Sequence, residues 1–285
     1  MWTSLISAAV LGTCIITLFL LERAFPLRQA KRALAGRLTV NLTFGIIAFA
    51  TVSLIVRPVA EATLGWTSTN EFGLIRLHMI PDALRPVAAF LLMDLTFYWW
   101  HRANHRLPLL WRLHNVHHFD PDLDLSTTFR FHFGELAFSS AFRVVQIGLI
   151  GPSLATYLVY EVIFQLGTLF HHSNLRLPIR VERILVRFLV TPRMHGIHHS
   201  QVKEETNANY STVFSFWDRL HRTVRLNVPQ EAINIGIPGY AEPQDNRLGN
   251  SLLAPFRLQR DYWPREDGHG SRRTNATGKP GQLAP

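Results

Sequence analysis

Histidines are concentrated in the middle of this sequence. The 285-residue chain has 14 of them, and most stand three or four residues apart, a spacing that places side chains on one face of a helix. The grouped positions are His101 and His105; His114, His117 and His118; His132; His171 and His172; and His195, His198 and His199. Because neutral imidazole is a good ligand for iron, zinc and copper, these groups predict a metal site.

The number of histidines favours two metal ions over one. The single cysteine, Cys14, excludes a thiolate cluster and an intrachain disulfide, so the ligands must be His, Asp or Glu. One zinc ion needs about four ligands, and the chain offers more than twice as many histidines. Two alternatives stay open: histidines that bind no metal, and a single structural or hydrolytic zinc site.

Two acidic residues lie inside apolar stretches, where a charge is costly and by default functional. Asp94 stands seven positions before His101 and Glu161 eleven before His172, so each falls close to the helical face of a histidine. We expect both carboxylates to accept hydrogen bonds from ligand histidines and to orient the rings. The alternative is a structural pairing with a basic residue such as Arg143.

Long apolar stretches must position these residues. The uncharged run 3–21 is long enough for a transmembrane helix and lacks the basic start of a signal peptide. The further runs are 41–60, 86–100 and about 136–170. Arg57 and Pro58 interrupt the first of these, and Gly151-Pro152 divides the last into two helices. The sequence therefore predicts an all-α, polytopic membrane protein with about four to five transmembrane helices.

Basic residues predict the orientation of these helices. The connection after the first run holds Arg23, Arg28, Lys31, Arg32 and Arg37. By the positive-inside rule this connection is cytoplasmic, whereas the connection 61–84, with only Arg76, stays outside. Counting the membrane crossings from there places all the histidine groups on the cytoplasmic side.

The charge distribution also limits the class of partner. The formal net charge is +9 and the pI is about 10.4. The basic residues lie between and after the apolar runs, which favours an anionic membrane surface over nucleic acid. From residue 263 the composition is typical of a disordered tail.

Several short segments carry a family resemblance. They read, in order, DLTFYWWHRANH, HNVHH, FRFHFGE, FHHSN, TPRMHGIHHS and NANYSTVFSFWDRL. Their order, spacing and flanks resemble the sterol desaturase and fatty acid hydroxylase superfamily. The expected organisation is 1–84 as membrane anchor helices, 85–225 as a fatty acid hydroxylase-like catalytic domain, 226–262 as a C-terminal extension and 263–285 as a tail.

The resemblance implies specific roles for the histidines. The implied metal ligands are His101, His105, His114, His117, His118, His132, His172, His195, His198 and His199. His171 is the less certain neighbour of His172, and Asn209 is expected near the metal. One departure is His221-Arg222-Thr223, where the family usually has Phe-Gly-Thr; it puts the local turn in doubt.

The resemblance also implies an activity. It predicts a membrane enzyme with two iron ions that uses O2 to hydroxylate or desaturate a lipid, with electrons from a separate redox protein or a pterin. Hydroxylation and desaturation both begin with hydrogen abstraction. The alternatives from other classes are a bis-histidine haem protein for electron transfer, and a non-catalytic or zinc-binding membrane lipid-binding protein of the same fold.

Overall fold

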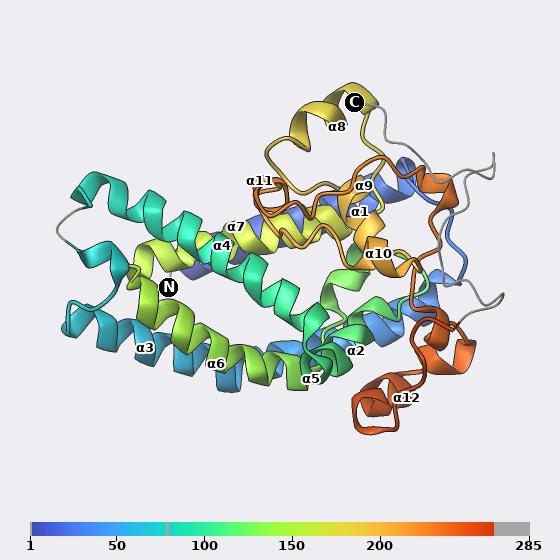
Figure 1. The fold of residues 1–285 in the computed structure, drawn as a ribbon, viewed down its shortest axis with the longest axis horizontal. Coiled ribbons are helices and arrows are strands. Elements are labelled where there is room, and N and C mark those ends of the chain that lie inside the picture. Colours follow the sequence, from blue (N-terminus) through green and yellow to red (C-terminus); the bar gives the residue numbers. More distant parts are fainter. Residues whose placement is uncertain (1, 78–79, 265–285) are drawn as a thin grey trace.

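The chain folds into a bundle of long helices with shorter helices gathered at one end (Figure 1). The computed structural model describes residues 2–77 and 80–264. The long helices are α1 (Trp2–Ala24), α2 (Leu34–Thr51), α3 (Arg57–Thr69), α4 (Arg85–Arg106), α6 (Phe133–Ile150) and α7 (Leu154–His172). The short ones are α5 (Pro108–His118), α8 (Ile179–Leu185), α9 (Pro192–His198), α10 (Lys203–Thr206), α11 (Phe216–Leu220) and α12 (Leu248–Leu253). In the described residues the only strand-like pairings are isolated bridges, which confirms the all-α fold class.

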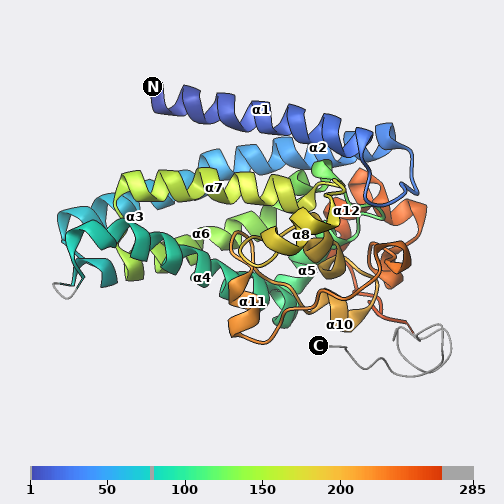
Figure 2. The same cartoon turned by 90° about the horizontal axis from the view of Figure 1, so that it is seen from above.

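Three stretches of the described chain are long and apolar enough to cross a membrane. They are Leu5–Ala24, Leu34–Arg76 and Phe133–Ile150. Helices α4 and α7 run alongside them in the same bundle (Figure 2) but are not among these stretches. The structure therefore supports a polytopic membrane protein, and the expected number of four to five transmembrane helices is not confirmed.

The second expected helix is longer than the sequence predicted. It runs from Leu34 through Arg57 and Pro58 to Thr69. A π-helical turn, η1 (Val52–Val56), ends just before Arg57, and Pro58 occupies the first turn of α3. A proline in the first turn of a helical segment needs no N–H, so the helix continues instead of breaking at this point. The connection expected at 61–84 is correspondingly shorter.

The expected break at Gly151-Pro152 is confirmed. Helix α6 ends at Ile150, and Gly151 adopts the left-handed conformation with φ 70° before Ser153 caps α7. A side chain on Gly151 would collide with the backbone of Phe72 and Gly73. The α6–α7 turn therefore packs closely on the loop between α3 and α4.

The ends of α4 and α7 meet at the same end of the bundle, together with α5 and α9 (Figures 1 and 2). Pro108 follows α4 and opens α5, so the chain changes direction between the first two histidine groups. The histidines at the ends of α4, α5, α7 and α9 can therefore face one another.

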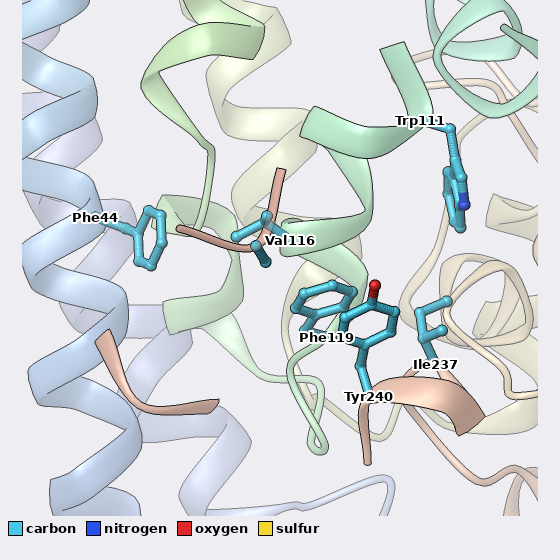
Figure 3. Packing of buried hydrophobic residues seen from close by; sticks show 7 residues of the cluster. Phe44, Trp111, Val116, Phe119, Ile237 and Tyr240 are labelled. Atoms are coloured by element: carbon cyan, nitrogen blue, oxygen red, sulfur yellow. The ribbon is translucent and has the colours of Figure 1, made fainter. Parts of the chain in front are cut away.

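The C-terminal segment packs on α5. Figure 3 shows Tyr240 against Phe119, with ring centroids 4.2 Å apart and nearly parallel planes. Trp111 and Ile237 belong to the same buried cluster. Burial of each such side chain contributes about 1.5–3 kcal/mol. The tail expected from residue 263 lies, beyond Pro264, outside the described residues.

Candidate metal centre

The structure divides nine of the histidines into two adjoining groups. In each group the ring nitrogens lie within 4.8 Å of one another. The five-histidine group is His101, His105, His114, His118 and His198, and the four-histidine group is His117, His172, His195 and His199. Between them, His118 stacks on His199 with centroids 4.3 Å apart, so the two groups touch.

The two H-x-x-H-H segments are shared reciprocally between the groups. In α5, His114 and His118 join the five-histidine group while His117 joins the other. In the segment around α9, His195 and His199 join the four-histidine group, whereas His198 joins the five-histidine group. Residues four apart lie on one helical face, and the residue between them is rotated away from that face. Each segment therefore serves both groups.

The four-histidine group has its ring nitrogens turned inward. The Nε2 atom of His172 lies 3.0 Å from Nε2 of His117 and 3.0 Å from Nε2 of His195, which is 3.1 Å from Nε2 of His199. His172 Nδ1 donates to the carbonyl of Thr168 at 2.8 Å, so its Nε2 is a bare lone pair. An ion about 2.1 Å from each of four imidazoles separates their nitrogens by roughly 3.4 Å in a tetrahedron. The cage therefore has the size of a metal site.

The five-histidine group is oriented from outside by hydrogen bonds at Nδ1. His101 donates to the carbonyl of Tyr210 at 2.7 Å, and His198 to the carbonyl of Ala208 at 2.7 Å. The Nε2 atom of His198, and both ring nitrogens of His105 and His118, are buried with no hydrogen-bond partner among the described residues. Unpartnered buried polar atoms are costly, and a bound metal ion would satisfy these nitrogens.

Burial keeps these imidazoles neutral. The pKa values of His117, His118, His195, His198 and His199 are lowered well below the ordinary value by burial and by the neighbouring histidines. A neutral imidazole offers the lone pair that a metal ion requires. The site is therefore prepared to bind a cation without first losing protons.

Residues 208–212, which belong to no helix or strand, orient three histidines with alternate carbonyl groups. The carbonyls of Ala208, Tyr210 and Thr212 accept from His198, His101 and His171 respectively. Every second residue of this segment therefore turns its carbonyl toward a histidine. We name residues 208–212 the carbonyl segment.

His171 lies outside both groups. Its Nδ1 donates to Thr212 at 3.1 Å, and its ring packs 4.1 Å from the ring of His195. The geometry thus places His172, and not His171, among the converging nitrogens.

Asn209 and Asp218 hold the carbonyl segment in place. Asn209 has φ 56°, and its side chain donates to the carbonyls of Met194 and Arg225 and accepts from the Arg225 N–H. Asp218 accepts from the N–H groups of Tyr210 and Ser211, each at 2.9 Å. Asn209 therefore lies next to the histidine-bearing helix α9, where it fixes backbone.

The departure at residues 221–223 leaves its turn intact. Arg222 adopts φ 57°, a conformation that favours glycine, and it stands at the position of the family's usual glycine. His221 stacks on Tyr98 with centroids 4.6 Å apart, and Thr223 donates to Asp218 at 2.6 Å. The backbone thus keeps the turn with a residue that is strained there.

Glu135 is the orienting carboxylate that the sequence analysis did not single out. It is buried at the start of α6 and accepts from His114 Nδ1 at 2.8 Å. The segment FRFHFGE contains it, but no helical spacing links it to His114, 21 positions earlier. Only the packing of α6 on α5 brings the two together.

Three predicted site residues make other contacts. His132 caps α6, with its Nδ1 accepting from the Gly134 N–H at 3.0 Å, and its Nε2 lies 3.1 Å from the carbonyl of Leu252. Asp94 accepts from the Phe214 N–H and from Trp217 Nε1.

Glu161 pairs with Arg143 at 2.7 Å, the alternative left open above. Seven residues of helix separate Asp94 from His101 by roughly 10 Å along the axis, so a shared face does not bring the two side chains into contact. The eleven residues between Glu161 and His172 give a still longer separation.

The chain is similar to several known proteins. The fatty acid hydroxylase family model matches residues 86–223. The ornithine lipid hydroxylase of Rhizobium tropici is 29% identical over 231 residues, which are 79% of this chain and 68% of that protein. Human alkylglycerol monooxygenase is 29% identical over 48% of this chain, and human cholesterol 25-hydroxylase 28% identical over 47%.

The coverage of these relatives differs. The match spans only 29% of human alkylglycerol monooxygenase and 49% of cholesterol 25-hydroxylase. No solved structure matches the chain. The matched residues 86–223 contain both histidine groups and the carbonyl segment. Residues 86–223 therefore form a fatty acid hydroxylase domain, as the resemblance of the histidine segments implied.

Proposed function

We propose that this protein is a membrane di-iron oxidoreductase that uses O2 to hydroxylate or desaturate a lipid. The observation that carries the proposal is the pair of adjoining, buried histidine groups with inward-facing nitrogens. The relatives are named as hydroxylases and monooxygenases of lipids, which supports a lipid-modifying oxidoreductase. The numbers and types of ligand fit two iron ions better than one zinc ion.

One set of residues would bind the metal ions, and a second set orients the histidine rings. Two bound iron ions would supply the oxidising power needed to break an unactivated C–H bond with O2. The nine histidines of the two groups would hold them, while the carbonyl segment and Glu135 fix three of the rings. Because the groups are buried, bulk water is kept away from the reacting carbon.

We further propose that the histidine end faces the cytoplasm. The basic connection between α1 and α2 lies at this end (Figure 1), as the positive-inside rule requires. Helix α8 exposes Ile179 and Ile184 together with Arg180 and Arg183, and Phe188, just after this helix, is exposed too. Such a mixed surface is typical of a helix at an anionic membrane interface. A lipid chain would enter from the bilayer, and electrons would arrive from water through a redox protein or a pterin.

The first substrate to test is ornithine lipid. The chain spans 68% of the ornithine lipid hydroxylase, more than of the other relatives described above. Alkylglycerol and cholesterol serve as the comparison substrates because two other relatives are named for them.

The test combines metal analysis with lipid analysis. Iron bound to the purified protein is counted, and lipid extracts of cells that express wild type or His117→Ala are compared by mass spectrometry. We expect two irons per chain and a wild-type-specific lipid that has gained one oxygen or lost two hydrogens. An intense Soret band would indicate haem, and bound zinc with an unchanged lipid profile would indicate the non-catalytic alternative; either result contradicts the proposal.

A further inference from the structure

The connection between α1 and α2 crosses the histidine end of the bundle (Figure 2). We name residues 22–32, which comprise the end of α1 and most of this connection, the strap. It lies outside residues 86–223 that the family model matches, yet its hydrogen bonds end on the segments that carry the four-histidine group.

The strap is bound most closely to the residues that follow His172. The buried carboxylate of Glu22 accepts from the Asn174 N–H at 2.8 Å and from the Leu125 N–H at 3.0 Å. Asn174 in turn accepts from the Arg28 N–H at 2.9 Å and donates to the Arg28 carbonyl at 2.8 Å. The Leu27 N–H donates to the Asn174 carbonyl at 2.7 Å. The backbone just after α7 is therefore held by Glu22 and by residues 27 and 28 of the strap.

The strap also holds the segment that follows α5. The carboxylate of Asp122 accepts from the N–H groups of Lys31 and Arg32, at 2.8 and 2.9 Å. Asp122 stands five residues after His117 and is buried. This second contact fixes the chain beyond another ligand of the same group.

A third contact reaches α9. The Arg28 guanidinium donates to Gln230 at 2.6 Å and lies against Gly196, where an added Cβ would come 2.2 Å from Nη1. Gly196 stands between His195 and His199, so the absence of a side chain there lets Arg28 approach the histidine-bearing backbone.

We propose that the strap positions the four-histidine group, with Glu22 and Asn174 as positioning residues. His172 is the one ligand contributed by α7, and α7 contributes none to the five-histidine group. Loosening Asn174 therefore disturbs the four-histidine group, whereas α4 keeps His101 and His105 in place. The inference rests on the proposed function, because it assumes that both groups bind metal.

The test measures metal binding without turnover. Full-length apo-protein in detergent is titrated with Zn²⁺ alone against a competing indicator. Wild type is expected to take up two equivalents. In Asn174→Ala and Glu22→Ala one equivalent should bind roughly 10–100-fold more weakly, while the other keeps its affinity. Glu22→Gln, which retains an oxygen that accepts both N–H groups, should restore the second equivalent.

Gly167→Ala is the matched control. A Cβ at Gly167 in α7 would meet Thr212 at an ordinary 3.5 Å, so this variant should bind as wild type does. Two equivalents of unchanged affinity in the two alanine variants would overturn the strap proposal alone. Equal weakening of both equivalents, or failure of Glu22→Gln to restore binding, would show a merely structural role and also overturn it. Fewer than two equivalents in wild type would overturn the proposed function and the strap with it.

Discussion

Replacing Glu135 by alanine removes a buried carboxylate that contacts a converging histidine. Its Oε1 accepts from His114 Nδ1 at 2.8 Å, and both side chains are buried. A hydrogen bond to a charged group contributes about 1.5–3 kcal/mol, and about 1.4 kcal/mol corresponds to a tenfold change in affinity. We therefore expect Glu135→Ala to weaken metal binding at the five-histidine group roughly 10–100-fold, which matches the usual effect of losing such a partner.

The assay is the same competition titration, followed by product formation at saturating iron. Glu135→Gln keeps an acceptor without the charge and should fall between alanine and wild type. Glu161→Gln is the control, because Glu161 pairs with Arg143 and lies away from the histidines. Unchanged affinity in Glu135→Ala would refute the reasoning, as would an equal loss of affinity in the control.

Three other outcomes are expected. His172→Ala should lose one bound metal whereas His171→Ala keeps both, because only His172 points its Nε2 at the other nitrogens; metal analysis of the two proteins distinguishes them, and equal loss would contradict the partition. Arg222→Gly should stabilise the protein by about 1 kcal/mol, because φ 57° is strained for arginine; thermal unfolding in detergent measures this, and a lower melting temperature would contradict it. Although burial alone raises the pKa of Asp124, Arg37 holds it below its ordinary 3.8. A lowered folded-state pKa adds stability above the unfolded value, and this stability is lost as the pH falls through the folded value. Thermal stability should therefore fall below about pH 4, and Asp124→Asn should lessen that fall; an identical pH profile in the variant would count against this explanation.

Local sequence patterns predicted where helices begin and end better than which residues their side chains contact. The turn at Gly151 follows from backbone chemistry within a few residues, and so it was predictable. The continuation of the helix through Pro58 was not, because it depends on where a π-helical turn falls. Asp94 and Glu161 shared faces with histidines, as their spacing indicated. Their separation along the axis, and the packing of Trp217 and Arg143, decided their contacts.

Contacts between elements were equally hard to predict at the candidate metal centre. Clusters of histidines were evident from spacing, but their partition was not. Helical geometry requires that His117 diverges from His114 and His118, yet only the packing of α5 against α7 and α9 decides which group receives which residue. Glu135 carried no spacing signal, since its contact with His114 arises between two helices.

The reciprocal sharing of α5 and the α9 segment bears on how constant the spacing between two bound ions can be. Each segment contributes a pair of histidines to one group and a single histidine to the other. The separation of the two groups is therefore fixed within about one helical turn of α5, and again within the segment around α9. A motion that separates the two groups must therefore distort α5 or the segment around α9, and not only the loops that join them.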